Sequence, residues 1–159
     1  KSWEIILSKT IPYVVVAFTT EATILLFARF LFGIPFRGSL LALAFFSLLF
    51  IITGLSMGIL ISTVTTSQRS AMFAALMATM LPSLLLSGFI FPLDSLAPVL
   101  RGFSYLVPAT YFLKILRGIV LKGAPLSDFW SQGAAMFLFA STLLTMATLR
   151  FNAQRGKPL

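Results

Sequence analysis

The chain has 159 residues, of which 58% are hydrophobic and 10% are charged, and its formal net charge is +8. Its mean hydropathy is +1.01, and because a soluble domain carries about 25% charged residues, this composition excludes a water-soluble globular protein and predicts an integral membrane protein. The sequence contains neither cysteine nor histidine, which excludes disulfides, thiol chemistry and the usual zinc or haem ligands.

The basic residues are spread along the whole chain. They lie between apolar stretches and form no patch, which favours contact with anionic lipid headgroups over binding of nucleic acid. The first residue is a lysine and no signal peptide precedes the first apolar stretch. We therefore expect the chain to be a fragment of a longer protein.

The first two apolar stretches predict membrane-spanning helices over residues 11–32 and 40–61, joined by a tight turn at residues 33–38. Glu21 falls near the middle of the first helix, where a carboxylate is costly unless it faces protein or water. It is either a polar residue satisfied by a neighbouring helix or a residue that lines a substrate path. In the second helix, small residues recur at every fourth position and share one face, which predicts close helix packing. These residues are Gly54, Gly58 and Ser62.

A short polar loop at residues 63–70 leads into a third span, predicted over residues 71–91. Pro82 lies within this span and is expected to kink it, or to loosen its hydrogen bonding one turn earlier. Small polar residues follow the proline and can satisfy the backbone groups that it sets free. They are Ser83, Ser87 and Gly88.

Residues 93–128 are too polar and too broken by proline and glycine to form one span, so we expect a helical hairpin that lies in the membrane interface or re-enters the membrane. Asp94 and Ser95 are a helix-start signal. A helix is predicted over residues 108–122, and Tyr105 and Tyr111 are expected at the level of the headgroups. At 100° per residue, its polar face carries Thr110, Lys114, Arg117 and Gly118, and its apolar face carries Phe112, Ile115, Leu116, Ile119 and Val120.

The fourth span is predicted over residues 129–149, capped by Ser127 and Asp128. Four spans place both ends of the chain on one side of the membrane. That side then carries six basic residues against five on the other, so the positive-inside rule only weakly favours cytoplasmic ends.

Catalytic chemistry has little support in this sequence. The four acidic residues are far apart, and a Ser-His-Asp triad is impossible without histidine. Residues 118–124 have the glycine spacing of a phosphate-binding loop, but the Lys-Ser/Thr pair that such a loop needs is missing. We expect no enzyme activity and no cofactor in this chain.

Several motifs together resemble the C-terminal half of a bacterial type-2 ABC transporter permease, of the branch that resembles multidrug exporters. They are S-G-F-I-F-P at residues 87–92, P-A-T-Y-F at 108–112, I-L-R-G-I at 115–119, G-I-L-I-S at 58–62 with Gln68 and Ala71, and W-E-I-I-L at 3–7. The resemblance covers essentially the whole chain. It implies an all-α membrane fold with four of the family's six spans and an extracytoplasmic re-entrant hairpin between the third and the fourth.

The resemblance also implies partners: a cytoplasmic ABC ATPase, which would hold ATP and magnesium, and a second permease subunit in a homodimer or heterodimer. The polar loop with Thr66, Ser67, Gln68 and Arg69 would face the ATPase. The hairpin would act as an outer gate, with Pro108, Tyr111, Lys114, Arg117 and Gly118 as its candidate residues. Ser87, Gly88 and Pro92 would join Pro82 and the small-residue face of the second span in helix packing and kinking.

Arg117 has two interpretations. It anchors its helix to headgroups or to carbonyl groups of the hairpin, or it is a surface arginine that extends its charge towards water.

These observations lead to an expected function, the permease subunit of an ATP-dependent exporter in a bacterial inner membrane. Two alternatives stay open. One is part of an ion-coupled secondary transporter or channel, with Glu21 as the ion site. The other is a membrane scaffold protein that transports nothing.

Overall fold

A computed structural model describes the backbone of residues 2–155 and the side chains of residues 11–150, and all regular secondary structure in this part is helical. Trp3 of the W-E-I-I-L motif lies outside the described side chains, and so do four of the basic residues counted above, namely Lys1, Lys9, Arg155 and Lys157. The α-helices are α1 (Ser2–Phe32), α2 (Leu40–Val64), α3 (Gln68–Ala75), α4 (Leu81–Leu86), α5 (Pro98–Ser104), α6 (Pro108–Arg117) and α7 (Trp130–Arg155). Short π-helical turns lie at Leu76–Met80 and Gly118–Lys122, and 3-10 turns lie at Leu93–Ser95 and Leu126–Phe129.

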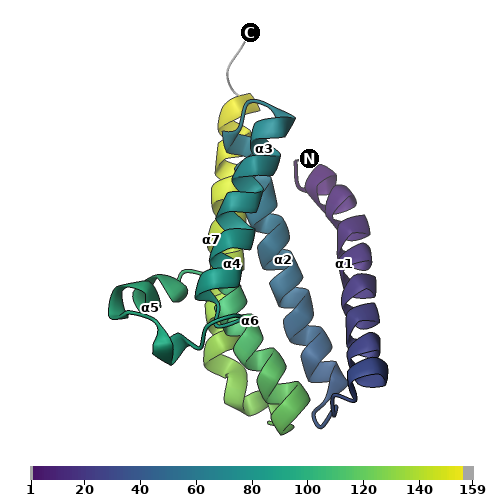
Figure 1. The fold of residues 1–159 in the computed structure, drawn as a ribbon. Helices are drawn as coiled ribbons and strands as arrows, with labels where there is room; N and C mark the ends of the chain where they lie inside the picture. Colours follow the sequence, from purple (N-terminus) through teal and green to yellow (C-terminus); the bar gives the residue numbers. More distant parts are fainter. Residues whose placement is uncertain (1, 156–159) are drawn as a thin grey trace.

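Four helical segments are long and apolar enough to cross a membrane, namely Ile11–Phe32, Leu40–Val64, Gln68–Leu86 and Leu126–Arg150. A fifth apolar segment is bent, because α5 and the helix formed by α6 and its π-helical turn meet at 85°. In Figure 1, the α2–α3 connection lies at the same end of the molecule as the C-terminal part of α7, and the α1–α2 connection lies at the other end. The predicted all-α membrane fold, with four spans and a helical hairpin before the last of them, is confirmed.

The starts of two spans follow from local capping. The Ser39 side chain accepts a hydrogen bond from the backbone N–H of Ala42 at the start of α2. At the start of α3, Ser67 and Ser70 form a capping box. Gly33 ends α1 in the left-handed region, with φ of 62°. The second span is longer than predicted, because α2 continues to Val64.

The third span ends earlier than predicted. The helix stops at Leu86 instead of residue 91, and Gly88 then adopts φ of 85°, which takes the chain out of the helix. A π-helical turn precedes Pro82, which lies in the first turn of α4. Leu86 lines the same cavity as Phe50 from the middle of α2, so the third span stops well before the far end of its neighbour.

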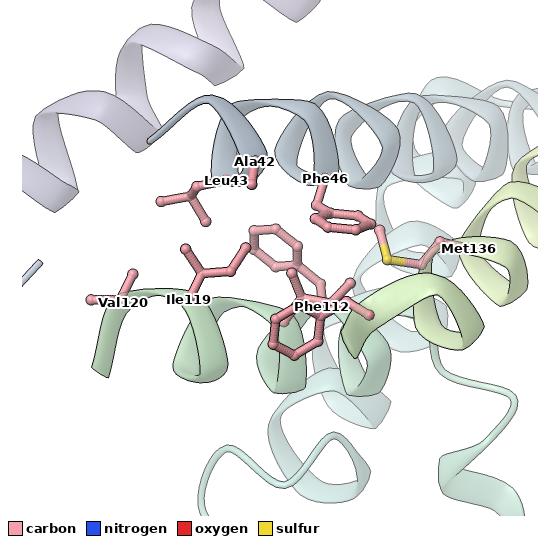
Figure 2. Close-up of a cluster of buried hydrophobic side chains, with 9 residues drawn as sticks. Ala42, Leu43, Phe46, Phe112, Ile119, Val120 and Met136 are labelled. Carbon is pink, nitrogen blue, oxygen red and sulfur yellow. The ribbon is translucent and has the colours of Figure 1, made fainter. Parts of the chain in front are cut away.

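The space beyond α4 is filled by α6, which packs against α2 and α7. Together with the π-helical turn that follows it, α6 supplies almost half of the buried core cluster. Figure 2 shows Phe112 and Ile119 facing Phe46, with Met136 closing the cluster at one side. Ile115 and Ile119 are 0% and 2% exposed. The predicted polar face of this helix is therefore wrong in part. Thr110 and Gly118 were assigned to its polar face, but both are buried, because α6 has protein on most of its sides.

Candidate functional site

The hairpin has two arms: the first is α5, and the second is α6 with its π-helical turn. A backbone hydrogen bond fixes the second arm to the α1–α2 connection. The N–H of Arg37 donates to the carbonyl oxygen of Val120 at 3.1 Å. Gly38 lies so close to Ile119 that an added Cβ would be 2.4 Å from the Ile119 carbonyl oxygen and 2.8 Å from its Cγ2. Only glycine allows this approach, so the end of α6 cannot move without the connection.

The same arm is held against α7 by an aromatic ring. An added Cβ on Gly118 would lie 2.3 Å from Cζ of Phe129, which occupies the space that the missing side chain leaves. The Phe129 ring also meets the Phe46 ring edge to face, with centroids 6.3 Å apart. The α6 helix and its π-helical turn therefore pack closely between α2 and the residues at the start of the last span.

Arg117 connects α6 to the end of the third span. Its guanidinium donates a hydrogen bond of 3.0 Å to the carbonyl oxygen of Gly88. The positive φ of Gly88 takes the chain out of the helix at this point, so the helix ends without a regular continuation. A guanidinium is a charge-assisted donor, which makes this link stronger than a bond between neutral groups. The acceptor, Gly88, directly follows the third span. It is not one of the hairpin carbonyl groups, within residues 93–128, that the sequence offered as partners of Arg117.

Two side-chain hydrogen bonds brace the bend between α5 and α6. Thr110, which is fully buried, donates to the Ser104 carbonyl oxygen at 2.8 Å, and the Tyr111 hydroxyl donates to the Tyr105 carbonyl oxygen at 2.8 Å. The Tyr111 bond satisfies the carbonyl of Tyr105, which follows the end of α5, and the Ser104 carbonyl also accepts a hydrogen bond of 3.1 Å from the backbone N–H of Val107. Pro108 begins α6 at a position that needs no N–H donor.

The first arm is much more exposed than the second. In Figure 1, α5 projects sideways from the bundle. Val99, Phe103 and Leu106 are 71%, 54% and 65% exposed. Arg101 and Asp94 form an ion pair at 3.2 Å, with both side chains largely exposed. Lys114 lies 5.9 Å from the centre of the Tyr105 ring. The hairpin is therefore asymmetric: α5 is apolar and exposed, whereas α6 is buried and fixed.

A cavity of about 280 Å³ lies between the bend of the hairpin, the middle of α2 and the third span. Gly54 and Pro82 both line it, and Pro82 follows directly on the π-helical turn. The missing Gly54 side chain and the irregular helix leave empty space at this level. The third span can therefore change its bend here without displacing core side chains.

The other predicted residues lie on α2, just before the hairpin, at the α2–α3 connection and in the first span. An added Cβ at Gly54 or Gly58 would meet nothing within 4 Å among the described residues, and Ser62 is exposed, so the role of this face in helix packing stays a prediction. Pro92, just before the first 3-10 turn, is exposed too. Thr66, Ser67, Gln68 and Arg69 lie together at the α2–α3 connection.

In the first span, Glu21 accepts a hydrogen bond from the Ser47 hydroxyl of α2. Across residues 2–155, the side chains that are described hold no cluster of potential metal ligands.

Three structural positions had no interpretation at the level of sequence. Gly38 and Phe129 were seen only as parts of a turn and of a span, and Ser47 was not considered. Each of these residues contacts a segment that is distant in the sequence. The one sign of such contacts in the sequence is that a small residue can pair with a large one.

Comparisons with known proteins extend these observations. A family model described as "ABC-2 type transporter" matches residues 1–121. The chain is 45% identical over 120 residues to "Probable multidrug ABC transporter permease YbhS" of Escherichia coli (strain K12), covering 76% of this chain and 32% of that protein. It is 33% identical over 155 residues to "Probable multidrug ABC transporter permease YbhR" of the same strain, covering 95% of this chain and 41% of that protein. It is also 33% identical over 117 residues to "ABC transporter G family member 23" of Dictyostelium discoideum, covering 74% of this chain and 16% of that protein. The chain therefore spans less than half the length of these relatives. No solved structure gives a significant match.

Proposed function

The chain belongs to the ABC-2 type transporter family, and from this membership we propose that it is part of the permease subunit of an ATP-driven exporter in a bacterial inner membrane. Two relatives from Escherichia coli carry names of multidrug ABC transporter permeases. A separate ATPase subunit supplies the energy, and it holds the ATP and the magnesium. The complete transporter contains a second permease, either identical or related.

One structural observation carries this proposal. The broken third span ends at Leu86, and α6 fills the space beyond it, held by Arg117 and by the α1–α2 connection. This arrangement places the irregular third span, with its π-helical turn and Pro82, beside a hairpin helix that is held by its neighbours. A transporter that alternates between two open states needs such a movable element beside a fixed one.

We propose an orientation in the membrane from where the two ends of the molecule lie. The polar α2–α3 connection and the C-terminal part of α7 lie at one end (Figure 1), and we place this end on the cytoplasmic side, against the ATPase. The hairpin ends near the α1–α2 connection, on the outer side. Closure of the ATPase then moves α3, and the π-helical turn before Pro82 absorbs the change in bend above the fixed hairpin.

The proposal is tested by reconstituting the full-length permease with its ATPase subunit in vesicles. We expect accumulation of a fluorescent cationic dye that needs both ATP and an intact ATPase subunit. The matched control is the same complex with the catalytic glutamate of the ATPase replaced by glutamine. ATP hydrolysis stops in that complex, while the permease is unchanged. Equal dye accumulation in both complexes would contradict the proposal.

The position of Glu21 favours a second candidate function. Its carboxylate lies in the first span and lines a cavity between α1 and α2, and a carboxylate at that depth is typical of ion-coupled transporters. In that case a proton gradient, without ATP, would drive dye accumulation in the same vesicles. The two candidates therefore differ in which energy source the vesicles need.

A further inference from the structure

A second cavity lies between α1 and α2, away from the hairpin. Its volume is about 570 Å³, within the roughly 300–1,000 Å³ of pockets that hold small organic molecules. Apolar side chains form most of its wall, among them Phe18, Leu25 and Leu43. Such a wall suits the apolar body of a ligand and gives no orientation by itself.

Two polar side chains of α2 and α1 give the cavity its orientation. Ser47, which is 1% exposed, donates its hydroxyl hydrogen bond to Oε1 of Glu21. This bond fixes the Glu21 carboxylate at the wall of the cavity, and both residues line it. Oε2 takes no part in that bond and is available to a ligand.

No basic side chain of the described chain neutralises this carboxylate. The salt bridge found among residues 11–150 joins Asp94 to Arg101. Arg29 lines the same cavity, but it is eight residues further along α1, which is about 12 Å at the rise of an α-helix. A carboxylate in an apolar setting is costly without a countercharge. Among the side chains of residues 11–150, none therefore supplies a countercharge at the Glu21 end of the cavity.

We propose that this cavity is a binding site for an amphipathic organic cation, whose charged group lies against Glu21 and whose apolar body lies along Phe18, Leu25 and Leu43. The proposal rests on the proposed transport function in one respect only, in that such a cation would be a transported substrate. Arg29 at the far end repels a second positive charge, so the site prefers a single charge at one end of the molecule over two.

The test is equilibrium binding to the full-length permease in lipid nanodiscs, without the ATPase subunit. The probes are tetraphenylphosphonium and tetraphenylborate, which have nearly the same size and shape but opposite charge. We expect wild-type protein to bind the cation more tightly than the anion. Replacement of Glu21 by glutamine keeps a group that can accept the Ser47 hydrogen bond and removes the charge. We expect it to weaken binding of the cation by about tenfold or more, the effect of losing one close charge pair.

The matched control is Arg29→Gln, which removes the charge at the other end of the same cavity. It should tighten binding of the cation slightly, because Arg29 repels a positive charge in the same cavity. Thermal unfolding of each variant shows whether it is folded. Two results would overturn the proposal: equal binding of the cation by wild type and Glu21→Gln, or tighter binding of the anion that is lost in Arg29→Gln. The second would indicate an anionic amphiphile, such as a lipid, as the occupant.

This measurement is independent of the proposed function. Binding needs neither ATP nor transport, so a permease that fails to export in vesicles can still bind the cation. Conversely, if the wild-type protein exports and the Glu21→Gln variant binds the cation normally, the proposed function stands and the proposed binding site is wrong.

Discussion

Replacement of Gly38 by alanine is expected to destabilise the protein more than any other change of one methyl group described here. The new Cβ would lie 2.4 Å from the carbonyl oxygen and 2.8 Å from Cγ2 of Ile119. Neither atom can move away easily, because Ile119 is 2% exposed and its backbone belongs to the turn that carries the hydrogen bond from Arg37 to Val120. Overpacking of this kind costs about 3 kcal/mol at the upper end of its usual range.

The measurement is the thermal unfolding midpoint of detergent-solubilised full-length protein, together with the yield of monodisperse material. We expect Gly38→Ala to lower both clearly. The matched control is Gly58→Ala, because a Cβ at that position meets nothing within 4 Å among the described residues, and alanine is the better helix former. A wild-type midpoint for Gly38→Ala would mean that the α1–α2 connection does not hold the hairpin.

Replacement of Arg117 by alanine is expected to reduce export by about tenfold while leaving ATP hydrolysis by the complex largely intact. The substitution removes the 3.0 Å hydrogen bond to the Gly88 carbonyl, and a hydrogen bond to a charged group contributes about 1.5–3 kcal/mol. The end of the third span would then be uncoupled from the fixed arm. Lysine can donate to the same carbonyl but lacks the planar fork of arginine, so Arg117→Lys should keep part of the activity.

The control for this experiment is Lys114→Ala, one turn earlier on α6. Lys114 is exposed and lies 5.9 Å from the centre of the Tyr105 ring, a weak interaction at an exposed site. We expect its export to stay near that of the wild type. Wild-type export by Arg117→Ala would mean that this side chain is a surface arginine and has no part in coupling.

The sequence predicts the helices well and their surroundings poorly, for a physical reason. In the hairpin, the spacing of Phe112, Ile115 and Ile119 predicts one apolar face, and all three are buried. In α1, however, Phe30 is 79% exposed within the described chain. A lipid tail is as apolar as a leucine side chain, so hydrophobic periodicity cannot separate a face that meets lipid from one that meets protein.

The end of the third span was missed for a related reason. Residues 89–91 are Phe-Ile-Phe and continue the apolar stretch, so hydropathy gives no sign that the helix has stopped at Leu86. The signal is Gly88, but a glycine in a membrane helix is common and often only a packing position. The contact between Glu21 and Ser47 joins two helices, and no local pattern can place one side chain opposite the other.

The central claim is that the hairpin turns back without crossing the membrane, so that four spans and not five connect the ends of this chain. Because the chain contains no cysteine, single cysteines can be introduced at Pro35, Ser67 and Ser127 and labelled in intact cells with a maleimide that does not cross membranes. We predict labelling of Pro35→Cys and Ser127→Cys from outside, and labelling of Ser67→Cys only in inverted vesicles. A Ser127→Cys variant labelled from the same side as Ser67→Cys would make the hairpin a fifth span and contradict the claim.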